Sequence, residues 1–290
     1  MLDINISIII IISLILTLII YRTTNFGMPK NFKNVKTGEK SGSHGSHFKI
    51  AIGETTYKQF SELMHYITFK GKREPFKYFD SFNYKVNKYL AIKEILPKFK
   101  DGRITNELIK KYLITAYPVN VKSESHQVKI ENIELWKHYE GFESWIKASF
   151  ESGANVYFFP TDFYANRYKY FSKDKLEINF SAFAYSVFKA PEGEMKDKEG
   201  RVLTYGKGSA LMPLWFSHKE AYLDDNIVQG TVKKIINLKK AKLILLEVNL
   251  SESCLNLWIY ATNRTIKTKI IRVNEYLACN AWIQGSIKEQ

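Results

Sequence analysis

The chain has 290 residues and a formal net charge of +14, and 45% of its residues are hydrophobic and 14% aromatic. This composition supports a packed core and excludes a largely disordered protein. The excess of Lys and Arg favours an acidic partner, either anionic lipid headgroups or a nucleic acid, with a protein partner as the other alternative.

The first feature in the chain is an uncharged run, INISIIIIISLILTLIIY, over residues 4–21. About eighteen apolar residues are enough for one helix to cross a lipid bilayer, so the sequence predicts a transmembrane anchor over residues 1–22. A cleaved signal peptide is the alternative, but the run lacks a positive segment before it and a small-residue cleavage site after it. Basic residues follow the run and none precedes it, which predicts a single-pass membrane protein whose C-terminal domain is cytosolic. The membrane-proximal basic residues are Arg22, Lys30, Lys33 and Lys36.

Residues 23–48 form a basic segment that ends in a tract rich in Gly, Ser and His, and they are expected to be a linker. His44 and His47 could bind a metal loosely, but a solvated spacer is the favoured interpretation. No metal site and no cofactor is expected, because the chain has no Cys-x-x-Cys pattern and no phosphate-binding glycine motif.

Residues 49–155 show apolar positions at spacings of three and four, which predicts a helical subdomain. The expected helices cover residues 55–67, 81–96, 105–116 and 132–150. Thr105 follows an Asp-Gly turn and is expected to begin the third helix. Trp136 and Trp145 are expected on the buried face of the fourth helix, in the core of the helical subdomain.

Beyond residue 155 the pattern changes to alternation, which predicts strands. Residues 156–226 are expected to be a β-rich middle region that includes a long strand over residues 176–188. Residues 227–290 predict five short strands, at 228–236, 243–250, 255–260, 267–273 and 277–287, that form a small barrel-like domain. An OB-like barrel is the specific form expected by analogy. The fold class predicted is therefore α+β.

The sequence contains no convincing catalytic pattern. Asp224 and Asp225 could hold a cation, although a turn explains them equally well, and His218 with a nearby serine lacks the strained elbow of an esterase. The favoured function is a non-enzymatic binding or adaptor domain. A membrane-tethered hydrolase with a site assembled from distant residues is the alternative.

A more specific hypothesis concerns the barrel-like region, in which the third strand would turn Trp258 and Tyr260 outward. Aromatic rings flanked by cations suit a single-stranded nucleic acid, so the sequence predicts binding across this face. The favoured interpretation is that both rings pack under the preceding domain and that the basic side chains only solubilise an edge. The basic residues expected around the rings are Lys239, Lys240, Lys242, Arg264, Lys267 and Lys269.

Overall fold

The structure is a computed structural model, and it describes most of the chain beyond residue 34. The described residues are 35–38, 44–53, 56–99, 104–136, 141–190, 193–196, 202–205, 208–214 and 221–289.

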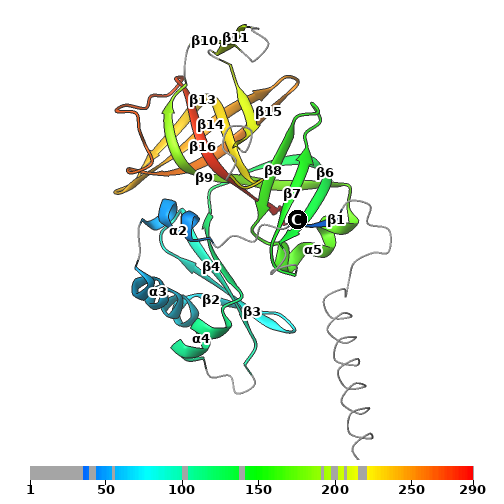
Figure 1. Cartoon of the computed structure of the whole chain (residues 1–290), viewed down its shortest axis with the longest axis vertical. Coiled ribbons are helices and arrows are strands. Elements are labelled where there is room, and N and C mark those ends of the chain that lie inside the picture. The colour runs from blue at the N-terminus through cyan, green and yellow to red at the C-terminus, as the bar shows by residue number, and fades with distance from the viewer. Residues whose placement is uncertain are drawn as a thin grey trace, which may run out of the picture.

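The first part of the fold is a four-stranded antiparallel sheet with helices against it (Figure 1). Its strands are ordered β2-β3-β4-β5. Helix α3 begins at a capping box, in which Thr56 and Gln59 exchange hydrogen bonds. Met64 and Ile67 of α3 pack on Ile92 of the sheet, which explains the spacing of three and four along the helix. The elements are α2 (Gly45–Ile52), α3 (Tyr57–Lys70), β2 (Lys72–Pro75), β3 (Phe79–Lys85), β4 (Leu90–Pro97), α4 (Asn106–Tyr112) and β5 (Thr115–Asn120).

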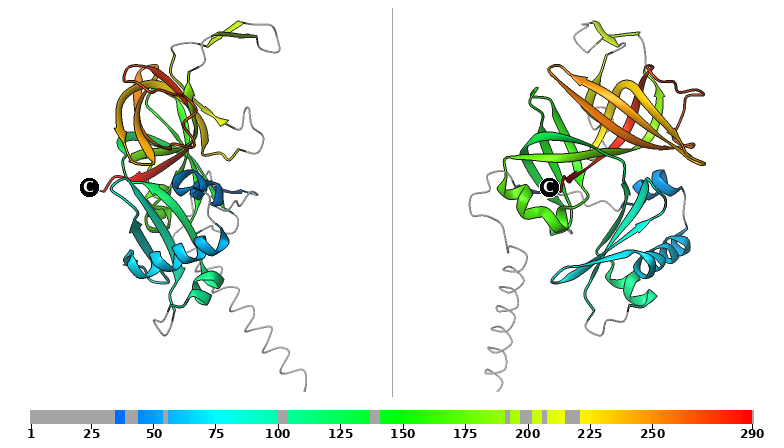
Figure 2. Two further views of the ribbon diagram at one scale, coloured as in Figure 1. Left: turned by 90° about the vertical axis from the view of Figure 1, so that its left-hand side faces the viewer. Right: turned by 180° about the vertical axis from the view of Figure 1, so that it is seen from behind.

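The rest of the fold is built on one long antiparallel ribbon of β9 (Lys175–Lys189) and β16 (Tyr276–Ile287), paired from Ile178 opposite Ile287 to Lys189 opposite Leu277. Two closed five-stranded sheets share this ribbon (Figures 1 and 2). The first closed sheet adds β6 (Glu124–Trp136), β7 (Ser144–Ser149) and β8 (Asn155–Pro160), with β6 pairing back to β9. The second adds β13 (Asp225–Asn237), β14 (Ala241–Leu250) and β15 (Ser253–Thr262), with β15 pairing back to β9 in parallel.

The remaining elements lie at the edges of these sheets. Strand β1 (Val35–Gly38) pairs in parallel with β6, and β12 (Ala210–Pro213) pairs with β13. Strands β10 (Gly193–Lys196) and β11 (Val202–Tyr205) form a separate hairpin. Helix α5 (Phe163–Ser172) connects β8 to β9.

The prediction of an α+β chain with a helical subdomain is wrong, because the described residues are mostly strand. The expected helix over residues 81–96 is the hairpin of β3 and β4, and the expected helix over residues 132–150 includes parts of β6 and β7. The expected strand over residues 267–273 does not form, and β9 takes its place as the fifth strand of the second closed sheet. That sheet therefore does not arise from residues 227–290 alone.

Within the described ranges, none of the helices has the length and apolar character that a membrane crossing requires. The predicted span over residues 4–21 and its basic neighbours Arg22, Lys30 and Lys33 lie outside those ranges. The prediction of a single-pass, membrane-anchored protein is corrected on this finding and is not carried further. The expected linker over residues 23–48 also needs correction, since it contains β1 with Lys36 and the first turn of α2.

Candidate functional site

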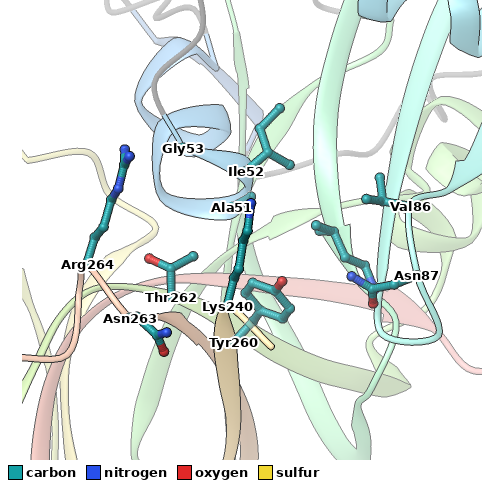
Figure 3. Close-up of a pocket in the computed structure, with 11 residues that line it drawn as sticks. Ala51, Ile52, Gly53, Val86, Asn87, Lys240, Tyr260, Thr262, Asn263 and Arg264 are labelled. Carbon is teal, nitrogen blue, oxygen red and sulfur yellow. The ribbon is translucent and has the colours of Figure 1, made fainter. Parts of the chain in front are cut away.

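A pocket of about 400 Å³ lies where α2 meets the second closed sheet (Figure 3). One wall is the C-terminal end of α2, from Ala51 to Gly53. A second wall is the turn between β3 and β4, and the third is the end of β15 with the residues that follow it. The remaining lining residues are Val86, Asn87, Leu90, Lys240, Tyr260, Thr262, Asn263 and Arg264.

Lys240 and Arg264 give the pocket a positive charge, and no acidic residue is among its described lining. Figure 3 shows both side chains rising from neighbouring loops toward α2. The two loops are joined, because the Asn263 amide donates a hydrogen bond of 3.0 Å to the Lys240 carbonyl. Within the described part of the chain, neither side chain makes a salt bridge. Two cations without a carboxylate partner on one pocket attract an anion.

Helix α2 explains the position of Arg264. The helix ends at Gly53, whose φ of 96° lies in the left-handed region that glycine adopts without strain. A Cβ at this position would lie 3.4 Å from Nη1 of Arg264, so the guanidinium lies directly against the helix end. The free carbonyls at a helix C-terminus carry partial negative charge, which favours a cation there.

Neutral hydrogen-bonding groups complete the lining. Asn87 is held in the β3–β4 turn because its Oδ1 accepts hydrogen bonds from the amides of Tyr89 and Leu90, at 2.8 and 3.0 Å. Burial raises the pKa of Tyr260, while its hydrogen bond with the Asn87 side chain lowers it. The Tyr260 hydroxyl is therefore neutral at physiological pH and can interact with an anionic ligand without repelling it.

The structure corrects the expectation that Trp258 and Tyr260 turn outward. Only 2% of Trp258 and 5% of Tyr260 is exposed. The alternation on β15 was interpreted correctly, since Leu257 and Ile259 fill the interior of the closed sheet. The opposite face is also covered, because both rings pack in a second cluster with Ala51 of α2 and Leu90 of β4. Trp258 donates from Nε1 to Glu124 at 2.7 Å and does not present a ring for stacking.

The six basic residues predicted around these rings fall into three groups. Lys240 and Arg264 line the pocket with Tyr260. Lys267 and Lys269 line a separate, shallower hollow of about 450 Å³ together with Lys189. Lys239 is exposed, and Lys242 donates a hydrogen bond to Asn237.

The contributions of Gly53 and Asn87 to the pocket were not predicted from the sequence. The Asn-Lys-Tyr step after β3 was a turn signal that could have placed Asn87 in a hairpin. No local signal connects the end of α2 to β15, because that contact joins segments about 200 residues apart.

Comparison with known proteins adds little. No protein-family model matches the chain, and no curated protein sequence matches it. Among solved structures, the chain is similar to the cytoplasmic molybdate-binding protein ModG in a form with molybdate bound. The similarity has a TM-score of 0.30 and 11% sequence identity, and it covers 55% of this chain and 94% of that chain. At this score the likeness supports no argument about fold or ligand.

Proposed function

We propose that this chain is a binding protein that holds a phosphate-bearing ligand of nucleotide size in the pocket between α2 and β15. The observation that carries the proposal is that Lys240 and Arg264 converge on one pocket without an acidic residue in its described lining. A guanidinium donates two parallel hydrogen bonds to a phosphate, and an ammonium adds a point charge.

The size of the pocket supports a small ligand. Its volume of about 400 Å³ lies within the range of roughly 300 to 1,000 Å³ that is usual for small-molecule sites. Asn87, Thr262 and Asn263 supply donors and acceptors for the non-phosphate part of the ligand. The phosphate could belong to a free nucleotide or to the end of a single-stranded nucleic acid, since the pocket recognises the same group in both.

Calorimetric titration of the full chain with adenosine monophosphate tests this proposal. Lys240→Ala and Arg264→Ala should each weaken binding about tenfold or more, because a charged hydrogen bond contributes about 1.5 to 3 kcal/mol. Lys239→Ala is the matched control: it removes the same charge from the neighbouring residue, which does not line the pocket, and should change affinity less than about twofold.

Two further titrations separate the sources of the phosphate. A short oligothymidylate with a 5′-phosphate should bind more tightly than the same strand without it if strand ends are the ligand. If the free nucleotide is the ligand, adenosine monophosphate should bind more tightly than either strand. Equal weakening by Lys239→Ala and Arg264→Ala would indicate diffuse electrostatic adhesion and contradict the proposed pocket.

A further inference from the structure

Helix α2 carries two buried histidines at its other end. The exposed fraction is 6% for His44 and 1% for His47, so the expected solvated spacer is wrong at these positions. The Nδ1 atoms of the two rings lie 2.8 Å apart. The His44 ring stacks on Trp136 at a centroid distance of 5.3 Å, and the His47 ring stacks on Trp282 at 3.7 Å.

The two rings form the centre of a continuous hydrogen-bonded chain, which we call the histidine chain. At one end His44 Nε2 lies 2.9 Å from Oε1 of Glu143. At the other end His47 Nε2 lies 2.8 Å from the Tyr185 hydroxyl, which donates to Oδ1 of Asp225 at 2.7 Å. The chain thus links α2 to the start of β7, to β9 and to β13.

A count of hydrogens constrains this chain. Its four contacts (Glu143–His44, His44–His47, His47–Tyr185 and Tyr185–Asp225) each need one hydrogen between two heavy atoms. With ionised carboxylates, neutral imidazoles and a neutral phenol, these five residues supply about three hydrogens. One contact would then bring two acceptors together. Four hydrogens would fill the four contacts, one in each. A fifth hydrogen would place two donors in the same contact.

In the part of the chain that the structure describes, no neighbouring basic side chain supplies the missing hydrogen. Among the described residues, the other titratable groups that face the histidine chain are Asp224, Tyr117 and Tyr222, from the segment before β13 and from β5. Asp224 accepts from Trp282 Nε1 at 2.6 Å, and Thr115 donates a short hydrogen bond to Glu143. Within the described residues, no Lys or Arg side chain makes a hydrogen bond or salt bridge to a member of the histidine chain.

We propose that the histidine chain retains one more proton than the same residues carry in the unfolded protein at neutral pH, and that this proton holds α2 in place within a limited pH window. The proton can reside at the Glu143–His44 end or on Asp225, because reversing the direction of all four hydrogen bonds moves it from one end to the other. Burial raises the pKa of Asp225 to about 6 and lowers the pKa of His47 well below 6.5, so a proton is favoured on this acid over the second imidazole.

The sign of the pH dependence follows from the proton counts. Above about pH 6.5 the five residues of the histidine chain bind about one proton fewer in the unfolded protein than in the folded protein. Stability therefore decreases as the pH rises. Between about pH 4.5 and 6.5 both unfolded imidazoles are charged, whereas two imidazolium rings cannot share the contact between the Nδ1 atoms. Stability then decreases as the pH falls, and the contribution of the histidine chain is largest near pH 6.5.

The histidine chain is connected to the proposed pocket through α2. Helix α2 has only eight residues, so its N-terminal histidines and the pocket wall at Ala51 to Gly53 belong to one rigid two-turn element. Loss of the histidine chain would therefore displace the pocket wall, and affinity for the anion would follow the same pH window. This coupling rests on the proposed function, whereas the retained proton does not.

The test is the unfolding free energy of the full chain measured in urea between pH 5 and pH 9. Tyr185→Phe removes two contacts and leaves the other two satisfied by neutral imidazoles and an ionised Glu143, so it needs no retained proton. Asp225→Asn keeps all contacts, because its amide can donate to Tyr185 while its oxygen accepts from the Tyr222 amide, which lies 2.9 Å from Oδ2 of Asp225 in the wild type. In both variants the decrease in stability above pH 6.5 should be smaller than in the wild type by about one proton.

His47→Gln tests the acidic side, since its amide can hydrogen-bond but cannot become charged. In this variant the decrease in stability below pH 6.5 should be smaller than in the wild type by the slope that corresponds to about one proton. Near-ultraviolet circular dichroism at pH 6.5 identifies any variant that has not folded, and Asp225→Asn serves if Tyr185→Phe fails. A wild-type slope above pH 6.5 in a folded Asp225→Asn variant would overturn the proposal.

Titrating wild type and Asp225→Asn with adenosine monophosphate at pH 6.5 and pH 8.5 measures the coupling. Affinity should fall at pH 8.5 in the wild type and not in the variant. Equal pH dependence in both would exclude the coupling. If adenosine monophosphate binds at neither pH, the proposed function fails, while the stability profiles still decide whether the proton is retained.

Discussion

The indole of Trp282 lies parallel to the imidazole of His47, with ring centroids 3.7 Å apart, and its Nε1 donates to Asp224 at 2.6 Å. A single side chain of β16 thus packs against α2 and hydrogen-bonds a carboxyl group that is fully buried. Burial is the main cause that raises the pKa of Asp224 well above its usual value, and the neighbouring Asp225 adds to it.

Trp282→Phe should destabilise the fold by about 1 to 3 kcal/mol, because it keeps an aromatic ring on His47 but removes the indole hydrogen bond to the buried Asp224 carboxyl. Trp258→Phe is the matched control. It also removes an indole donor, but the acceptor Glu124 is partly exposed and can bind water instead. Urea unfolding at pH 6.5 measures both losses, and a larger loss for Trp258→Phe would contradict this account of the Trp282 contact.

Glu94 should make stability decrease as the pH rises from about 4.5 to 8. Burial raises the pKa of Glu94 to about 8 from an ordinary value of 4.5, while a hydrogen bond from Thr68 opposes the shift. A raised pKa means that the folded chain holds a proton which the unfolded chain releases, so stability is lost between about pH 4.5 and 8. Glu94→Gln should therefore stabilise the protein by about 2 to 5 kcal/mol at pH 9 and change it little at pH 4. An equal effect at both pH values would show that folding does not raise the pKa of Glu94.

Gly285 marks the point where β8 joins the shared ribbon, opposite Pro160. A Cβ on Gly285 would lie 2.5 Å from Phe158 and 2.9 Å from Ile178. Gly285→Ala should cost about 1 to 3 kcal/mol in thermal or urea unfolding, because a packed core resists an added methyl group. Gly208→Ala is the control, since no heavy atom of the described residues outside its chain neighbours lies within 4 Å of the added group, and it should be nearly neutral. A neutral Gly285→Ala would argue against the shared ribbon at this position.

Local signals predicted some elements well. The apolar positions at spacings of three and four identified α3, and alternation identified β14 and β15. Helix was wrongly predicted over residues 81–96 because β4 is buried on both faces, with Leu90 to Ile92 and Glu94 to Leu96 all enclosed. A strand covered on both sides loses its alternation and imitates the spacing of a helix.

The candidate site was only partly predictable. Three predicted residues, Lys240, Tyr260 and Arg264, do line one pocket, because short loops of neighbouring strands bring them together. The wall formed by α2 was not foreseen, since its Gly-Ser-His composition resembles a linker. Only the contacts with Trp136 and Trp282, far along the chain, make His44 and His47 part of the core.

Nuclear magnetic resonance of the isotope-labelled full chain, titrated with adenosine monophosphate, tests the proposed pocket most directly. The account predicts that the amide signals of Gly53, Asn87, Asn263 and Arg264 shift together and saturate at one affinity, and that Arg264→Ala raises the ligand concentration needed for saturation about tenfold or more. Shifts confined to Lys267 to Ile270, or the absence of any saturable shift at low salt, would contradict it.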